Sequence, residues 1–89
     1  MEKDNQDCLN AIEFALNDQW DAAHKIVQEI STPNAQWIHA VLHKIEGDES
    51  NSRYWYSRCS LESYESYLDS TQELKAIKER LKKSLSFPK

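Results

Sequence analysis

Residues 32–48 read TPNAQWIHAVLHKIEGD and contain the clearest helical signal in the chain. Apolar side chains recur there at the three- and four-residue steps that align them on one helix face: Ile38, Val41, Leu42 and Ile45. Thr32 and Pro33 are typical of a helix start, because a Thr hydroxyl caps free N–H groups and proline has none to satisfy. Gly47 suits the left-handed residue that often ends a helix. We therefore predict a helix over residues 33–46 with its apolar face against a core.

The segment before this helix has the same periodicity and predicts two further helices. They are expected over residues 4–17 and 20–30, since small and aliphatic residues return at helical spacing in both. The corner between them contains Asn17 and Asp18, whose short polar side chains are typical N-caps. We expect these two residues to cap the second helix.

Two more helices are predicted after the glycine. Asp48 is placed to cap a fourth helix over residues 49–60. Ser70 and Glu73 have the spacing of a capping box, in which each side chain bonds the other's backbone N–H, so a fifth helix is expected to begin there. Its apolar stripe consists of Leu74, Ile77, Leu81 and Leu85. Residues 61–69 either extend the fourth helix or form a separate turn.

The composition supports one small all-α domain. The chain has 89 residues, of which 39% are hydrophobic and 10% aromatic, more than a disordered chain contains. One glycine and two prolines leave little turn chemistry for β-hairpins or phosphate-binding loops. We therefore expect residues 1–89 to form a single domain of four to five antiparallel helices.

Charge and processing signals narrow the partners and the compartment. A formal net charge of −4 gives no attraction for nucleic acid. We expect a cytoplasmic protein without membrane contact, because the first residues are polar and no apolar run approaches the roughly 20 residues that span a bilayer. Cys8 and Cys59 lie too far apart in sequence for a redox or zinc pair, so both are expected to be reduced packing residues.

The last helix differs in charge from the rest. Residues 73–89 contain six basic and two acidic residues, although the whole chain is acidic. We expect this helix to lie on an acidic surface, with its apolar stripe docked across the helices at 33–46 and 49–60 or between two copies of the chain.

The third and fourth helices also carry a family pattern. Small and aromatic residues stand at the positions that a tetratricopeptide repeat uses on either side of its corner: Ala40, Gly47, Asp48, Ser52, Tyr56 and Cys59. The segment resembles a degenerate tetratricopeptide-repeat hairpin. This resemblance implies stacked helical hairpins, an architecture that presents binding surfaces.

A second resemblance covers residues 17–60. The chain is similar to small uncharacterised bacterial helical proteins in the strings Trp20-Asp21-x-Ala23-His24, Trp37-x-His39-Ala40-x-x-His43, Glu46-Gly47-Asp48-x-x-Asn51 and Tyr54-Trp55-Tyr56-x-Arg58. The likeness implies a shared helical architecture and transfers no activity.

His39, His43 and Glu46 form the most chemically suggestive spacing. They lie on successive turns of one helix, at the flank of its apolar stripe. Three interpretations are open: boundary histidines that pack their rings, a metal site, or a polar pocket for a small ligand or peptide terminus. A metalloprotease needs Glu directly after the first His, where this chain has Ala40. We expect no enzymatic activity.

The remaining candidates surround the corner at Gly47. Arg58 is expected to reach back to a carboxylate there, and successive aromatic residues at 54–56 require at least one exposed ring. The candidate binding residues are Trp37, His39, His43, Glu46, Asp48, Asn51, Tyr54, Trp55 and Arg58. The sequence predicts a non-enzymatic, protein-binding or self-associating domain without a cofactor. The alternative is small-ligand or metal binding on the His39/His43/Glu46 face.

Overall fold

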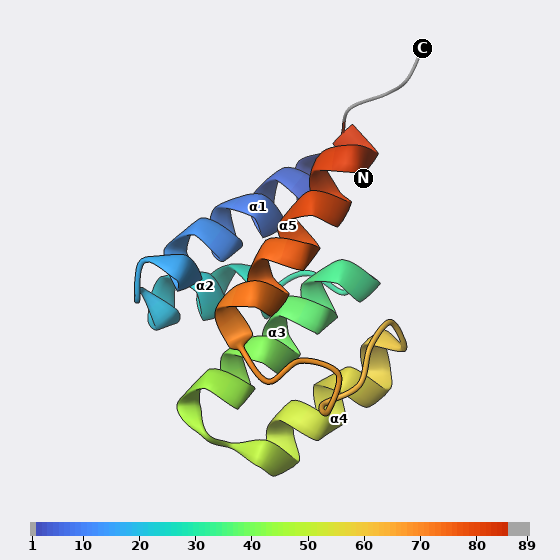
Figure 1. Cartoon of the computed structure of the whole chain (residues 1–89). Coiled ribbons are helices and arrows are strands. Elements are labelled where there is room, and N and C mark those ends of the chain that lie inside the picture. Colours follow the sequence, from blue (N-terminus) through green and yellow to red (C-terminus); the bar gives the residue numbers. More distant parts are fainter. Residues whose placement is uncertain (1, 86–89) are drawn as a thin grey trace.

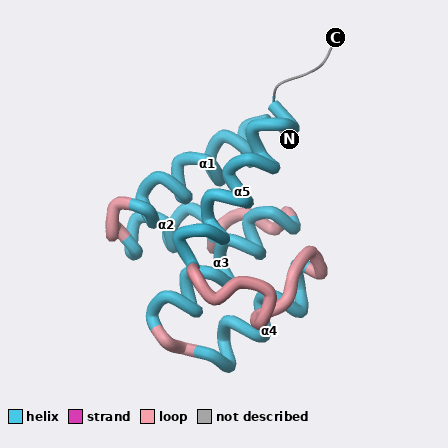
Figure 2. Tube along the Cα trace, in the orientation of Figure 1, coloured by secondary structure: helices cyan, strands magenta, loops and turns pink. Residues whose placement is uncertain are grey.

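The computed structural model describes residues 2–85, and that part of the chain folds into helices joined by loops (Figures 1 and 2). The five helices are α1 (Glu2–Leu16), α2 (Trp20–Val27), α3 (Pro33–Glu46), α4 (Glu49–Cys59) and α5 (Ser70–Leu85). Residues 60–69 form the long connection between α4 and α5 that Figure 2 shows in pink. The predicted all-α class is confirmed.

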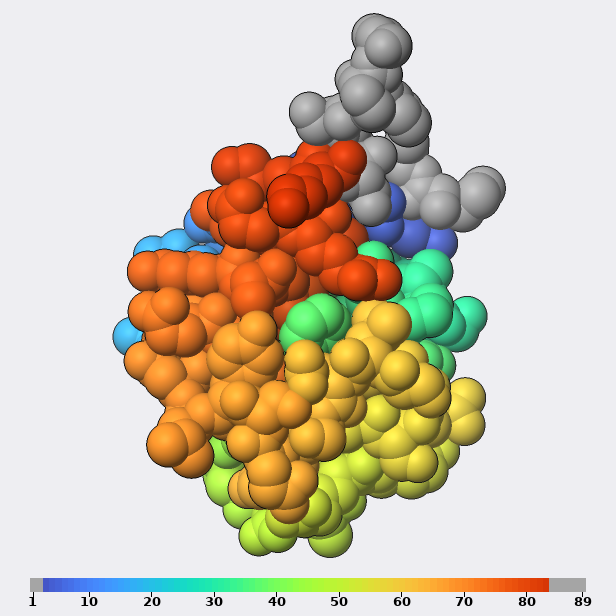
Figure 3. Space-filling view, turned by 45° about the vertical axis from the view of Figure 1, so that its right-hand side comes forward, coloured from blue at the N-terminus to red at the C-terminus, as the bar shows by residue number. Residues whose placement is uncertain are grey.

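Helix α3 is the centre of the molecule. It contacts α1, α2, α4 and α5, and every residue from Ala35 to His43 is buried (Figure 1). In Figure 3, α5 and the connection at 60–69 lie over the middle of α3. Because this middle part is enclosed, its polar residues lie inside the protein. These buried polar residues form the sites described below.

The caps predicted around α3 are confirmed. The Thr32 hydroxyl accepts a bond from the Ala35 N–H at 3.3 Å, and Pro33 occupies the first turn. Gly47 adopts a left-handed conformation with φ of 86°. Asp48 then accepts from the Asn51 N–H at 3.3 Å and caps α4. Local side-chain chemistry therefore fixes both ends of α3 and the start of α4.

The predicted cap between α1 and α2 was wrong. Asn17 donates from Nδ2 to the Glu13 carbonyl at 2.8 Å, and Asp18 has φ of 63°, so both residues close α1 instead. Gln19 precedes α2 without a side-chain cap bond. Helix α2 also ends at Val27 rather than at residue 30, because a tight turn over residues 28–30 leads to the new helix start at Thr32.

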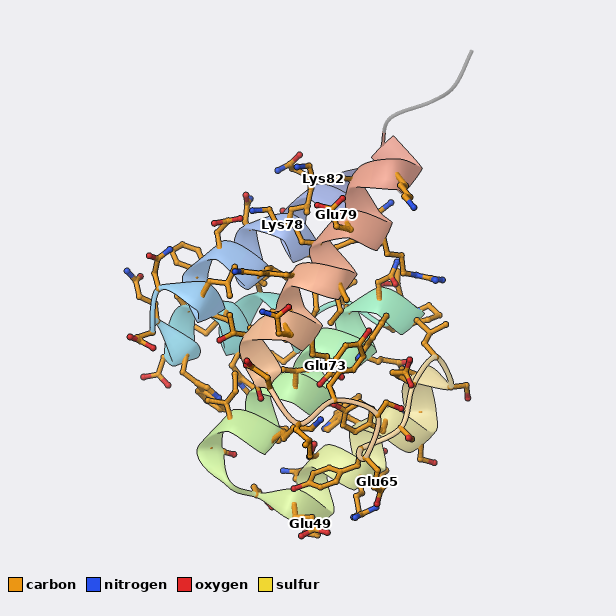
Figure 4. The ribbon with its side chains drawn as sticks, viewed as in Figure 1. Glu49, Glu65, Glu73, Lys78, Glu79 and Lys82 are labelled. Carbon is orange, nitrogen blue, oxygen red and sulfur yellow. The ribbon has the colours of Figure 1, made fainter. Side chains whose placement is uncertain are left out.

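The predicted capping box at the start of α5 was also wrong. Asp69 is the cap, since its Oδ1 accepts from the N–H groups of Thr71 at 2.9 Å and Gln72 at 3.4 Å. The Glu73 side chain does not return to the backbone of Ser70. It is fully buried and points from α5 towards the interior, where Figure 4 labels it. Residues 61–69 are separate from α4, which ends at Cys59.

Helix α5 docks on a different pair of helices from the one predicted. Its Leu74, Ile77 and Leu81 are at most 1% exposed and face α1 and α3 rather than α3 and α4. Lys78 pairs with Glu13 of α1, so the acidic surface under this basic helix includes the protein's own first helix. The Leu85 side chain lies outside the described part of the structure.

Two packing predictions have different outcomes. Cys8 and Cys59 are both buried and free of disulfide bonds, as expected. Ile45, predicted to face the core with the rest of its stripe, is 45% exposed and lies in the last turn of α3, after the buried run from Ala35 to His43. None of the helices within residues 2–85 has both the length and the apolar character to cross a bilayer.

Candidate metal centre

All three histidines of the sequence meet between α2 and α3. His39 and His43 extend from neighbouring turns of α3, and His24 reaches them from α2. The Nε2 atoms of His24 and His39 are 3.1 Å apart, and one potential ligand atom from each histidine lies within 4.8 Å of the others. Helix α2 presents His24 here because the preceding residue, Ala23, is buried in the core with Val27.

Two indole rings frame the cluster. Trp20 stacks on His24 with ring centroids 4.7 Å apart, and Trp55 stacks on His39 at 4.0 Å. Trp20 is itself held in place, since its Nε1–H donates to the Leu42 carbonyl at 2.6 Å. The indoles exclude water from two sides of the cluster and limit the orientations of the imidazoles.

Glu46 orients the third imidazole. Its Oε2 lies 2.7 Å from Nδ1 of His43. In the tautomer that donates from Nδ1, the lone pair of His43 remains on Nε2. Carboxylates commonly hold metal-ligating histidines in this way and raise the basicity of the ligand nitrogen. Glu46 therefore acts on the cluster through His43.

The environment disfavours the charged forms of His39 and His24. Burial lowers the pKa of His39 to about 4, and the neighbouring histidines add to the effect. Burial also lowers the pKa of His24, with His43 contributing and the carboxylates of Glu46 and Asp21 opposing the change. A neutral imidazole offers a free lone pair, which is the form that binds metal ions.

The sequence interpretation identified only part of this centre. His39 and His43 pack their rings against neighbouring aromatic rings, as the boundary interpretation predicted, but at 5% and 7% exposed they lie deeper than a boundary position implies. The predicted trio with Glu46 is replaced by one with His24. The sequence alone did not place His24 in the cluster, because its position there depends on how α2 packs on α3. The available signal was that His24 follows Trp20 by four residues, which puts both rings on one face of α2.

The other predicted binding residues do not share one surface. Trp37 lies on the opposite side of α3 and donates to Glu73 at 2.8 Å. Asp48 joins His43 and Glu46 in a second group of closely spaced ligand atoms, and Asn51 bonds Asp48 at the corner.

Arg58 does not brace the corner at Gly47 as predicted. It lies near the other end of α4, with its guanidinium carbon 5.8 Å from the Tyr54 ring centre and 5.7 Å from that of Trp55. The prediction of an exposed aromatic ring is confirmed, since Tyr54 is 52% exposed while Tyr56 is 4% exposed.

A second buried polar group went unpredicted. Glu73 accepts bonds from Trp37 Nε1 at 2.8 Å and from the Tyr56 hydroxyl at 2.6 Å. Lys44 pairs with it at 2.9 Å and also donates to the Tyr67 carbonyl. These bonds join α3, α4, α5 and the connection before α5. Every partner is supplied internally, so this group has a structural role.

The sequence matches no protein-family model, and neither the curated proteins nor the solved structures give a match. The resemblances to tetratricopeptide repeats and to small bacterial helical proteins therefore stay predictions from the sequence. The chemistry of the described residues carries the functional argument that follows.

Proposed function

We propose that the protein binds one divalent transition-metal ion, Zn²⁺ in the first instance, through His24, His39 and His43. The convergence of the three imidazoles carries this proposal. Two nitrogens on a tetrahedral zinc ion lie about 3.3 Å apart, given Zn–N bonds of about 2.0–2.1 Å. The observed separation of 3.1 Å between His24 and His39 differs from this by only a few tenths of an ångström. Small rotations of the His43 side chain would bring its ligand nitrogen to a similar distance from the other two.

The donor type indicates which metals fit. Imidazole nitrogen suits zinc, copper, nickel and cobalt, whereas calcium and magnesium require oxygen ligands. The second group, formed by His43, Glu46 and Asp48, is less suitable, because Asp48 is already engaged with Asn51 as the cap of α4.

Zinc titration of the chelator-treated protein tests the proposal. Calorimetry and elemental analysis after dialysis should give one ion per chain. His24→Gln, His39→Gln and His43→Gln should each weaken binding at least tenfold, because each removes one of three bonds to the ion. Asp48→Asn is the matched control, since asparagine also caps helices and the change affects only the second group.

Two results would contradict metal binding at this cluster. One is a wild-type protein that retains no zinc after dialysis, which would leave the His24–His39 contact as an interior hydrogen bond. The other is unchanged affinity in His24→Gln, which would assign the ion to another group. Circular dichroism of each variant checks that its fold is retained.

Self-association is a second, non-enzymatic candidate function. Leu68 is fully exposed and Ile45 is 45% exposed. Both border a hollow of about 420 Å³ between the ends of α1 and α3 and the start of α5. A second copy covering these side chains would remove apolar surface from water. Light scattering should show an increase in mass with concentration, which Leu68→Ser should reduce. A constant monomer mass would contradict this candidate.

A further inference from the structure

We infer that the ion held by the three histidines keeps one coordination position open for a small monodentate anion. This inference rests on the proposed metal binding and concerns what the bound ion does next. Tetrahedral zinc needs four donors, and structural zinc sites take all four from the protein. Three protein ligands with a free fourth position form an exchangeable site instead. The number and position of the protein donors therefore decide whether the site is structural or exchangeable.

The described side chains supply three donors at the cluster. The nearest carboxylate, Glu46, is bonded to Nδ1 of His43 at 2.7 Å. The two nitrogens of an imidazole point in diverging directions, so this carboxylate lies on the far side of the ring from an ion bound at Nε2. Asp48 is held at the corner by Asn51, from both the backbone and the side-chain nitrogen. Neither carboxylate is placed to complete the coordination.

The α2 side of the cluster is the side that solvent can reach. His39 and His43 are almost fully buried, whereas His24 is half-buried and reaches the surface. A ligand from solvent therefore approaches past His24. The indoles of Trp20 and Trp55 stack on His24 and His39, so the ligand must be small enough to pass between them.

The charge of the site favours an anion. Three neutral imidazoles leave the full charge of a divalent ion uncompensated. Its attraction for an anion is strong between two indole rings, because the local dielectric is low. The carboxylates of Glu46 and Asp21 act on His24 and repel a multiply charged anion more strongly than a monovalent one. Hydroxide, azide and similar monovalent anions have the required charge and size.

Cobalt substitution with azide as the probe tests the inference. Co²⁺ occupies zinc sites and has visible absorption bands that respond to a change of ligand. We expect the cobalt-loaded wild-type protein to show a saturable shift of these bands with one azide per cobalt, while dialysis shows that cobalt stays bound. Glu46→Gln should bind cobalt more weakly, because Glu46 orients His43. At saturating cobalt it should still show the azide response, because that side chain is not the fourth ligand.

The outcomes separate this inference from the proposed function. Bound cobalt whose bands do not respond to azide would overturn the open position and leave metal binding intact. A response that appears only in Glu46→Gln would show that Glu46 is the fourth ligand, and would also overturn the inference. Loss of cobalt on addition of azide would show extraction of the metal instead of ligand binding, and would overturn the open position. Failure to bind cobalt at all would overturn both proposals.

Discussion

Glu73 shows how strongly one buried residue can depend on its partners. Glu73→Gln keeps the shape of the side chain but removes its charge, which leaves the Lys44 ammonium, 10% exposed, without its carboxylate. Breaking a buried pair in this way typically costs about 3–5 kcal/mol. We expect a loss of that size in the free energy of unfolding, measured with urea. Glu79→Gln, at an exposed position of the same helix, should change it by less than about 0.5 kcal/mol. Equal losses would contradict the role of Glu73.

Gly47 is constrained by its backbone alone. Its φ is 86°, and a Cβ placed there would meet no atom within 4 Å. Gly47→Val should therefore destabilise the protein by about 1–2 kcal/mol through backbone strain, without any steric clash. Gly47→Asn should cost less, because asparagine tolerates the left-handed region. Urea midpoints that are the same for both variants would show that the left-handed cap contributes nothing to stability.

These two residues show what the sequence can predict at this scale. Gly47 was predicted because a helix end is determined by its immediate neighbours. Glu73 was misassigned because the capping-box spacing is compatible with two positions of the side chain. The choice between them depends on Lys44, Trp37 and Tyr56, which approach from other helices.

Among the elements, α5 depends most on its apolar stripe. Leu81 is fully buried, so Leu81→Asp places a charge in the core and should cost about 4 kcal/mol or more, enough to unfold a small domain at any salt concentration. Lys82→Glu combined with Lys83→Glu changes only exposed residues and should cost less than about 1 kcal/mol, mainly at low salt. Thermal melts at low and high salt compare the two variants. A similar loss in both would show that charge, not packing, holds α5.

The helices were predictable as separate elements, but their pairing was not. Periodicity located four of them, because an apolar stripe repeats within one helix, and the cap at Asp48 located α4. Whether α5 lies on α1 or α4 depends on contacts between residues far apart in sequence, and no local pattern records them. The histidine cluster has the same property. Its α3 histidines were visible as an i, i+4 pair, whereas His24 belongs to α2 and joins them only through packing.

At the scale of the whole molecule, α3 separates two buried polar centres. The histidine cluster lies on its α2 side, and the Glu73 group lies on its α5 side. Every buried side-chain nitrogen and oxygen within the described residues has a hydrogen-bond partner. The fold therefore does not need a metal to satisfy its interior, unlike a zinc finger, which unfolds without its ion. Bound metal would instead stabilise an already folded domain.

The lowered pKa values of His39 and His24 should make the metal-free protein sensitive to acid. Histidines in an unfolded chain have a pKa near 6.5, whereas burial lowers the pKa of His39 to about 4 in the folded state. Between these two pH values the unfolded chain binds more protons, so the free energy of unfolding must fall as the pH decreases. For His39 the total loss is about 3 kcal/mol between pH 6.5 and 4. Burial lowers the pKa of His24 too and adds to the loss in the same direction.

Urea unfolding at a series of pH values, with a chelator present, measures this dependence. His39→Gln should be less stable than the wild type at neutral pH, because it loses a buried contact, but its stability should fall less between pH 6.5 and 4. The reason is that glutamine does not titrate, so the variant lacks the largest difference in proton binding between the two states. Parallel pH profiles for the two proteins would contradict the assignment of acid sensitivity to His39.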